Sequence, residues 1–130
     1  MLKAKDVMTK EVITISPDAT LVDVSELLGA KRITGMPVVD AEGKVIGIIT
    51  EKDILNYAYT YTGSLKNTKV KEAMTEKVVS FISDTDIDKI SLCFSKSDFR
   101  RVPIIDEGKL VGIITRRDII TSLISHHYQG

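Results

Sequence analysis

Two segments of this chain place a threonine and an aspartate three residues apart, directly after a short apolar run. Residues 47–53 read GIITEKD and residues 112–118 read GIITRRD. A threonine that begins a helix accepts a hydrogen bond from a backbone N–H two or three residues on, and an acidic residue at that position can bond back to the threonine N–H. Both segments are therefore predicted to be strand-to-helix turns. The spacing alone leaves open whether these side chains only cap a helix or also bind a ligand.

The remaining polar residues do not form a pattern typical of an enzyme. The sequence contains no Ser/His/Asp arrangement and no Cys/His cluster with the spacing of metal ligands. The two histidines, His126 and His127, are adjacent in the polar tail. We therefore expect a non-enzymatic protein without a metal site.

The composition narrows the class of protein further. The chain has 130 residues, 43% of them hydrophobic, and its 18 basic and 18 acidic side chains give a formal net charge of zero. Nucleic-acid binding needs clustered positive charge, so this balance argues against a broad nucleic-acid contact. No apolar run approaches the roughly 20 residues that span a bilayer, and the N-terminus lacks a signal-peptide core. The single cysteine, Cys93, fits a reducing compartment, so a cytoplasmic location is expected.

The chain repeats itself once. The sequence Val7-Met8-Thr9 aligns with Ala73-Met74-Thr75 at a spacing of 66 residues, which is kept as far as Asp40 and Asp106. Beyond a turn the spacing becomes 65. A turn is where a change in length costs least. The predicted repeats are residues 1–62 and 63–130.

Each repeat is predicted to fold in the order strand, helix, strand, strand, helix. In the first copy the predicted elements cover residues 11–15, 20 to about 34, 36–40, 44–49 and 50–58. Thr20 and Asp23 should cap the first of these helices, and Gly35 and Pro37 should end it. In the second copy the elements cover residues 77–81, 86–96, 102–105, 109–114 and 115–125. The fold class is therefore α+β, two pseudo-symmetric β-α-β-β-α repeats that we expect to pack through their sheets.

Apolar residues at helical spacing form a stripe on the first long helix of each copy. We expect some of this apolar surface, together with the closing helix of each copy, to form a two-fold dimer interface, because it exceeds what a single layer of helices would need. Cys93 aligns with Leu27 on the same face and is predicted to lie in the core. The stripe residues are Leu21, Val24, Leu28, Ile87, Ile90 and Phe94.

The order, spacing and duplication of these motifs resemble the CBS domain, named for cystathionine β-synthase. Both copies carry an M-T followed by a proline strand, an acidic-glycine turn and the G-x-I-T-x-x-D segment, and the resemblance extends from about Val7 to Ser122. A stand-alone CBS pair is also called a Bateman module. The resemblance implies a cleft between the two repeats that binds AMP, ADP, ATP or S-adenosylmethionine, no required cofactor, and a homodimer in the form of a disc of four repeats.

The resemblance also implies roles for individual residues. Asp53 and Asp118 would accept the ribose hydroxyls, as one carboxylate can accept from both. Thr50 and Thr115 would lie on the phosphate side, where a helix start favours an anion. Each site would borrow residues from the opposite repeat. The remaining residues are Ile48 and Ile113 beside the adenine, Thr14, Ile15, Ser16 and Thr34 for the Asp118 site, and Val79 to Phe81, Phe99 and Arg100 for the Asp53 site.

The two copies differ in charge around their aspartates. The second copy has Arg116 and Arg117 within its motif and Arg100 and Arg101 before its proline strand. The first copy has Glu51 and Lys52 in its motif. We therefore expect the Thr115/Asp118 site to prefer ligands that carry phosphate, while the arginines could equally be solvated surface charge.

Two functions from different classes follow. The first is a regulatory sensor that binds an adenosine nucleotide and passes a change in shape to an effector protein. The second is a structural dimerisation scaffold in which the T-x-x-D pairs only cap helices. A membrane partner is not expected.

Overall fold

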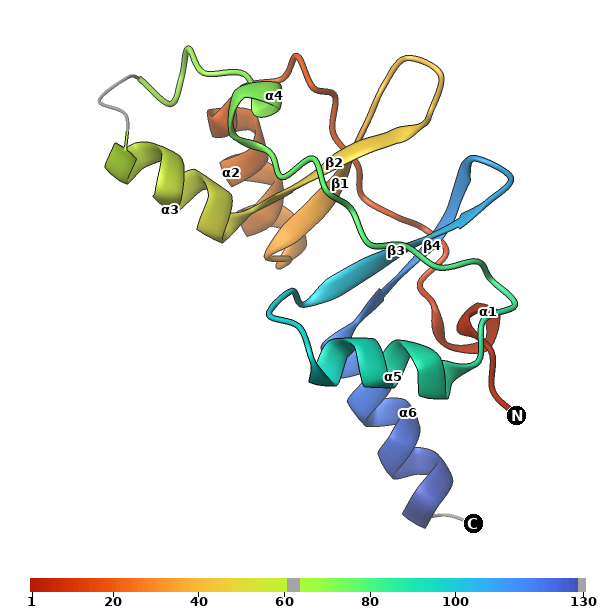
Figure 1. The fold of residues 1–130 in the computed structure, drawn as a ribbon. Helices are drawn as coiled ribbons and strands as arrows, with labels where there is room; N and C mark the ends of the chain where they lie inside the picture. Colours follow the sequence, from red (N-terminus) through yellow and green to blue (C-terminus); the bar gives the residue numbers. More distant parts are fainter. Residues whose placement is uncertain (61–63, 129–130) are drawn as a thin grey trace. The chain divides into compact units, whose positions relative to one another are not determined.

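The computed structural model describes residues 1–60 and 64–128, with side chains as far as Ser125. The chain forms two compact units, Ile13–Val78 and the combination of Met1–Val12 with Val79–Gly130. We call them the Asp53 unit and the Asp118 unit, after the aspartate of the T-x-x-D segment that each contains. Figure 1 shows that each unit has one strand hairpin and its own set of helices.

The Asp53 unit is built on an antiparallel hairpin of β1 (Gly35–Val39) and β2 (Val45–Thr50). Its helices are α2 (Leu21–Lys31), α3 (Glu51–Thr60) and α4 (Val70–Ala73). The hairpin and the helices enclose a core because alternate strand residues and one face of α2 are apolar. The buried residues of this core are Ile15, Leu21, Val24, Leu28, Met36, Val38, Ile49 and Val70.

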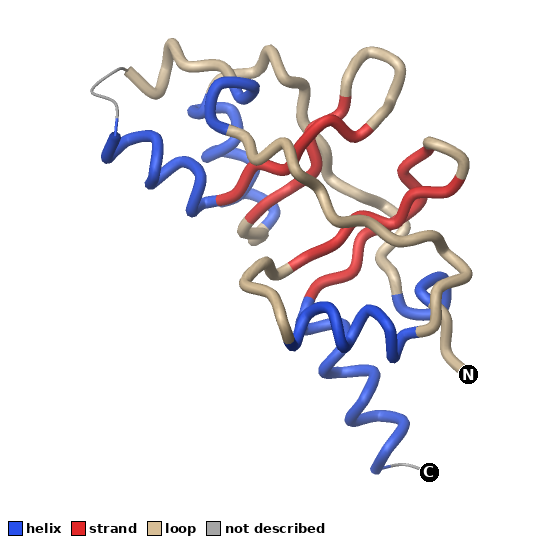
Figure 2. Tube along the Cα trace, viewed as in Figure 1, coloured by secondary structure: helices blue, strands red, loops and turns tan. Residues whose placement is uncertain are grey.

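The Asp118 unit repeats this arrangement with β3 (Arg101–Asp106) and β4 (Lys109–Thr115). Its helices are α1 (Ala4–Val7), α5 (Ile87–Ser95) and α6 (Arg116–Tyr128). In both units a long helix, two strands and a closing helix follow one another in this order (Figure 2), while the short helix comes last in the Asp53 unit and first in the Asp118 unit. The buried residues of this core are Ala4, Ile87, Ile90, Phe94, Val102, Ile104, Ile114 and Ile119.

Most predicted elements are confirmed, with three differences. The extended segments before α2 and α5 do not form strands, and each makes a single parallel bridge to its hairpin, Ile15 to Val38 and Phe81 to Ile104. Helix α2 ends at Lys31, earlier than predicted, because Arg32 adopts a left-handed conformation with φ 55°. The third difference is the presence of α1 and α4, two four-residue helices that the apolar periodicity did not indicate.

The two short helices are exchanged between the sequence copies. Helix α1 lies near the start of the first copy but packs in the Asp118 unit, against β4 and α6. Helix α4 begins the second copy but packs in the Asp53 unit, against β2 and α3. Their inward residues Ala4 and Val70 are completely buried. Each compact unit therefore takes its short helix from the other copy of the sequence repeat, while repeat boundaries at 62 and 63 stay a prediction.

Hydrogen bonds and two ion pairs, Lys3 with Asp86 and Lys5 with Asp84, hold the N-terminal segment against the rest of the Asp118 unit. The Ala4 N–H donates to Thr85 O at 2.8 Å, and the Ile87 N–H donates to Leu2 O at 3.0 Å. Lys3 Nζ lies 2.6 Å from Asp86 Oδ1. This hydrogen bond raises the pKa of Lys3 and lowers the pKa of Asp86. The ion pair therefore stabilises the docked N-terminal segment at every pH above the ordinary pKa of an aspartate and below that of a lysine.

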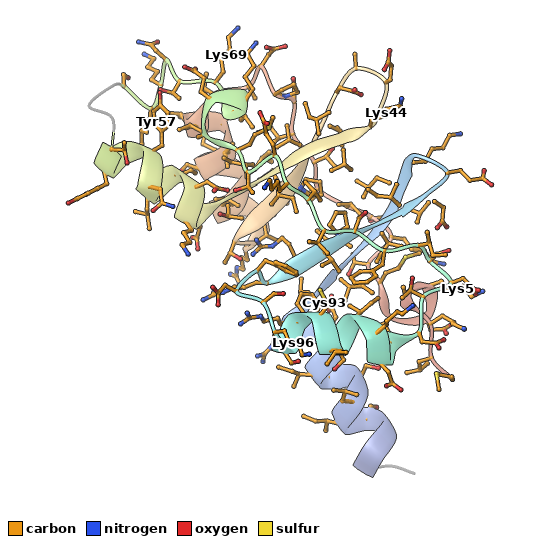
Figure 3. All side chains as sticks on the ribbon, viewed as in Figure 1. Lys5, Lys44, Tyr57, Lys69, Cys93 and Lys96 are labelled. Atoms are coloured by element: carbon orange, nitrogen blue, oxygen red, sulfur yellow. The ribbon has the colours of Figure 1, made fainter. Side chains whose placement is uncertain are left out.

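The apolar stripes of α2 and α5 are buried in the cores of their own units. All six stripe residues are among the buried core residues. The prediction that the stripes contribute to a dimer interface is therefore wrong, because other core residues of the same unit already cover them. The contribution of the closing helices stays a prediction. Leu27 and Cys93, on the flanks of the two stripes, are half-buried; Figure 3 labels Cys93 on α5.

Candidate functional site

The first T-x-x-D segment forms the predicted turn between β2 and α3. The Thr50 N–H and the Thr50 Oγ1 hydroxyl donate to Asp53 Oδ2, at 2.9 Å and 3.0 Å. The Asp53 N–H donates back to Thr50 Oγ1 at 3.2 Å. Strand β2 ends here because the turn satisfies backbone N–H groups that a helix start leaves without partners.

The second T-x-x-D segment forms the same turn between β4 and α6. The Thr115 N–H donates to Asp118 Oδ2 at 2.9 Å, and the Asp118 N–H donates to Thr115 Oγ1 at 3.1 Å. The two aspartates are only partly buried. Both segments are therefore capping boxes, and capping does not exhaust the acceptor capacity of a carboxylate, which has about four lone-pair sites.

A Met-Thr segment runs beside the end of the second hairpin strand in each unit. Thr75 and Ile48 exchange two backbone hydrogen bonds of 2.9 Å in the Asp53 unit. Thr9 and Ile113 do the same in the Asp118 unit, at 2.9 and 3.0 Å. The short helices α4 and α1 lead into these segments, so the exchanged part of the chain reaches each T-x-x-D turn.

The hydroxyl groups of these two threonines differ in their hydrogen bonds: within the described residues, the Thr75 hydroxyl reaches a carboxylate and the Thr9 hydroxyl does not. Thr75 Oγ1 donates to Asp53 Oδ1 at 2.9 Å. The two Met-Thr segments align in the sequence, but neither threonine is among the predicted site residues. The repeat of Met-Thr was the available signal, yet it could not show which carboxylate the hydroxyl would reach.

The arginine of the Asp118 turn supports a neighbouring loop. Arg116 donates from Nε to Phe99 O at 3.0 Å and from a terminal nitrogen to Ser97 O at 2.7 Å. Its backbone N–H donates to Arg100 O at 2.9 Å. Glu51, at the matching position of the Asp53 unit, repeats only the backbone bond, to Thr34 O at 3.0 Å. The Arg116 guanidinium therefore fixes the loop before β3, whereas Arg117 is exposed beside the start of α6.

Other predicted site residues are distributed between exposed and packed positions. Arg101 is 8% exposed, and Phe99 packs edge-to-face against Phe94 with ring centroids 5.9 Å apart. Arg100 and Val79 are exposed. Of these residues, Arg100 and Val79 are the ones whose exposure allows contact with a dissolved molecule.

The predicted residues of the first copy divide in the same way. Ile15 is in the core, and its N–H and carbonyl bond to Pro37 O and the Val39 N–H. Thr14 is half-buried, whereas Ser16 and Thr34 are exposed. Ile15 therefore packs in the core, and Thr14, Ser16 and Thr34 are more accessible to a dissolved ligand.

Each unit brings together its own aspartate, threonine and isoleucine. Ile48 and Ile113 are half-buried and precede the fully buried Ile49 and Ile114, so their side chains point to the other face of the hairpin. Thr14 to Ser16 and Thr34 belong to the Asp53 unit, and Val79, Phe99 and Arg100 belong to the Asp118 unit. Contributions from one repeat to the site of the other stay predictions.

The described residues form no metal site and no membrane span, so the T-x-x-D turns are the candidate site. In the part of the chain that the structure describes, no three histidine, cysteine, aspartate or glutamate residues are placed to hold a metal ion. The helices within residues 1–60 and 64–128 include none with the length and apolar character to cross a bilayer.

Comparison with known proteins identifies the family. The CBS-domain family profile matches residues 4–59 and 70–125. The chain therefore belongs to the CBS-domain family and contains two CBS domains. The α+β fold, with short antiparallel strand pairs and helices, matches the fold of solved CBS-pair proteins.

Two curated relatives show how this pair of domains occurs in other chains. The chain is 31% identical over 130 residues to the CBS domain-containing protein YhcV of Bacillus subtilis, covering 100% of this chain and 91% of that one. It is 39% identical over 119 residues to inosine-5'-monophosphate dehydrogenase of Methanocaldococcus jannaschii. That match covers 91% of this chain but only 23% of the enzyme.

Two solved structures resemble the whole chain and contain ligands. CBSX2 of Arabidopsis thaliana in complex with AMP superimposes with a TM-score of 0.85 and 25% identity, covering 97% of this chain and 98% of that one. The CBS pair of protein MJ0100, in complex with 5'-methylthioadenosine and S-adenosyl-L-methionine, gives a TM-score of 0.84 and 28% identity. It covers 97% of this chain and 98% of that one.

Proposed function

We propose that this chain is a non-enzymatic regulatory module that binds an adenosine nucleotide at its T-x-x-D turns. The observation that carries the proposal is the partly buried carboxylate of Asp118 at the start of a long helix, with acceptor capacity beyond its capping bond. Support comes from the AMP and S-adenosylmethionine complexes of structures that resemble the chain over almost its full length.

In this proposal each part of the ligand meets a group suited to it. The ribose hydroxyls donate to the Asp118 carboxylate in charge-assisted hydrogen bonds. A phosphate lies near Thr115 at the start of α6, where the helix dipole favours negative charge, and the exposed Arg117 adds a positive charge. The apolar side chain of Ile113 contacts the adenine.

The two turns are proposed to differ in their preferred ligand. Both helix starts offer the same dipole, so the adjacent side chains decide. Glu51 is the first residue of α3 and opposes a phosphate, while Lys52 offsets it. Arg116 and Arg117 begin α6. The Asp118 turn should therefore favour AMP, ADP or ATP, and the Asp53 turn a less anionic ligand such as S-adenosylmethionine.

A thermal-unfolding series with AMP, ADP, ATP and S-adenosylmethionine tests the function. A ligand at 100 times its dissociation constant should stabilise the protein by about 2.7 kcal/mol. Inosine monophosphate and ribose 5-phosphate are controls for the adenine and for the phosphate. If none of the four adenosyl ligands raises the midpoint of unfolding, the structural scaffold is the better account and this proposal fails.

The homodimer remains a proposal on the closing helices, the part of the predicted interface that lies outside the buried stripes. Leu55 and Tyr59 on α3 are 69% and 95% exposed, and Ile120 and Ile124, their repeat equivalents on α6, are 56% and 54% exposed. Residues four apart lie on one helix face, so each closing helix presents an apolar pair. Such pairs are suited to a two-fold interface between copies of the chain.

Sedimentation at micromolar concentration should give twice the 14.4 kDa mass of the chain. The double variant Leu55→Glu/Ile120→Glu should shift the protein to monomer, because a two-fold interface would then bury unpaired charge. Ile82→Glu, at a position 57% exposed outside the helices, is the matched control and should remain dimeric. A monomeric wild-type protein would exclude the dimer.

A cytoplasmic location and an effector protein that responds to the ligand complete the proposal.

A further inference from the structure

The two carboxylates at the T-x-x-D turns are not equally available. Among the described residues, Asp53 accepts three hydrogen bonds, two at Oδ2 from Thr50 and one at Oδ1 from the Thr75 hydroxyl. Within the same described part of the chain, Asp118 accepts one, from the Thr115 N–H. We propose that Thr75 determines the specificity of the Asp53 turn by occupying a carboxylate site that a ribose hydroxyl would otherwise use. This inference rests on the proposed nucleotide binding.

Counting acceptor sites explains the expected effect. A carboxylate offers about four lone-pair sites, two on each oxygen. With Oδ2 filled by two donors and Oδ1 by one, Asp53 retains a single site. The vicinal hydroxyls of a ribose supply two donors, so full binding of the diol requires one existing donor to leave. Asp118 retains about three sites and accepts both hydroxyls without that loss.

Thr75 is the donor that the ligand can displace. The Thr50 N–H and hydroxyl belong to the turn itself and cap α3, whereas the Thr75 hydroxyl comes from a neighbouring segment and rotates about a single bond. Thr75 is exposed, so its hydroxyl can bond to water after it leaves Asp53. The backbone bridge between Thr75 and Ile48 holds the residue beside Asp53 in either case.

Thr9 provides an internal control for this interpretation. It occupies the equivalent position in the repeat and makes the same two backbone bonds, to Ile113. The two turns therefore share their backbone pairing and differ in the use of one hydroxyl. If this hydroxyl limits binding, a change at Thr75 has an effect that the same change at Thr9 lacks.

The consequence is a difference in sugar specificity. The Asp53 turn, with one open acceptor, gains little from a second hydroxyl and should discriminate weakly between AMP and 2'-deoxy-AMP. The Asp118 turn should bind AMP clearly better than the deoxy form, because loss of a hydroxyl leaves an acceptor of a charged group without its donor. Removing the Thr75 hydroxyl should make the Asp53 turn resemble the Asp118 turn.

Calorimetric titration of AMP and 2'-deoxy-AMP into single-site variants tests the inference. The Asp118→Ala chain reports on the Asp53 turn, and Asp118→Ala/Thr75→Val is compared with it. We expect Thr75→Val to strengthen AMP binding about two- to tenfold and to raise the preference for AMP over 2'-deoxy-AMP. Thr75→Ser, which keeps the hydroxyl, should behave like threonine. Thr9→Val in the Asp53→Ala chain should leave both affinities unchanged.

The outcomes separate this inference from the proposed function. Thermal unfolding of each variant without ligand shows that it is folded. If AMP binds the wild-type protein but Thr75→Val leaves the Asp53 turn unchanged, weaker or still without binding, the inference is overturned and the proposed function stands. If the wild-type protein binds none of the four adenosyl ligands, the proposed function fails first.

Discussion

Replacing Asp118 by alanine should strongly weaken nucleotide binding at the Asp118 turn while leaving the protein folded. The variant loses charge-assisted hydrogen bonds to the ribose, so the affinity for AMP should fall about 10- to 150-fold. It also loses the capping bond from the Thr115 N–H, which should lower the free energy of unfolding by about 1 kcal/mol. Calorimetric titration measures the first effect, and urea unfolding without ligand measures the second.

Helix α2 provides the matched control for this experiment. The Thr20 N–H donates to Asp23 Oδ2 at 2.9 Å and the Asp23 N–H donates to Thr20 Oγ1 at 3.2 Å, which is the same capping box outside the proposed site. Asp23→Ala should therefore lower stability by a similar amount and leave AMP affinity unchanged. If Asp118→Ala behaves like Asp23→Ala in both measurements, Asp118 is a cap and does not bind the ribose.

The largest expected effect on stability comes from two glycines that lie against the exchanged segments. A Cβ at Gly112 would overlap the Met8 sulfur, and a Cβ at Gly47 would lie 2.7 Å from the Met74 sulfur. At Gly47 the same Cβ would also lie 2.9 Å from the carbonyl oxygen of Thr75. Gly112→Ala and Gly47→Ala should each lower the free energy of unfolding by about 1–3 kcal/mol, because the added methyl overpacks the contact.

The two contacts should respond differently to shortening the methionine. The two nearest atoms at Gly112 are the sulfur and Cγ of Met8, which Met8→Ala removes, and only the Met8 Cβ at 3.1 Å remains, so Gly112→Ala should cost less in a Met8→Ala background. At Gly47 the backbone carbonyl of Thr75 remains, so Gly47→Ala should still destabilise a Met74→Ala protein. Urea unfolding of the two double-mutant cycles measures the difference. An equal cost of Gly112→Ala with and without Met8 would contradict this packing.

Local sequence signals predicted the hairpins, the long helices and both T-x-x-D turns. These elements depend on residues close in sequence, such as Thr20 with Asp23, whose mutual capping needs no information about distant parts of the chain. The repeat made the prediction stronger, since the same pattern had to form twice. The Asp53 and Asp118 turns were therefore predictable down to their backbone hydrogen bonds.

Features that depend on distant residues were not predictable in this way. Helices α1 and α4 contain four residues each, too few for an apolar periodicity, and their exchange between units depends on contacts with β4 and β2. The bond from Thr75 to Asp53 joins residues 22 positions apart, and the equivalent threonine is Thr9. An apolar stripe has the same appearance whether it faces a core or a partner, so burial of Leu21 and Ile87 required the structure.

Titration of AMP into the wild-type chain and into the double variant Asp53→Ala/Asp118→Ala tests the central proposal most directly. The proposal predicts saturable binding by the wild-type protein and none by the double variant, with Asp23→Ala binding as the wild type does. Circular dichroism should show that the double variant is folded. Equal binding of AMP by the wild-type protein and the double variant would contradict the assignment of the nucleotide to the T-x-x-D turns.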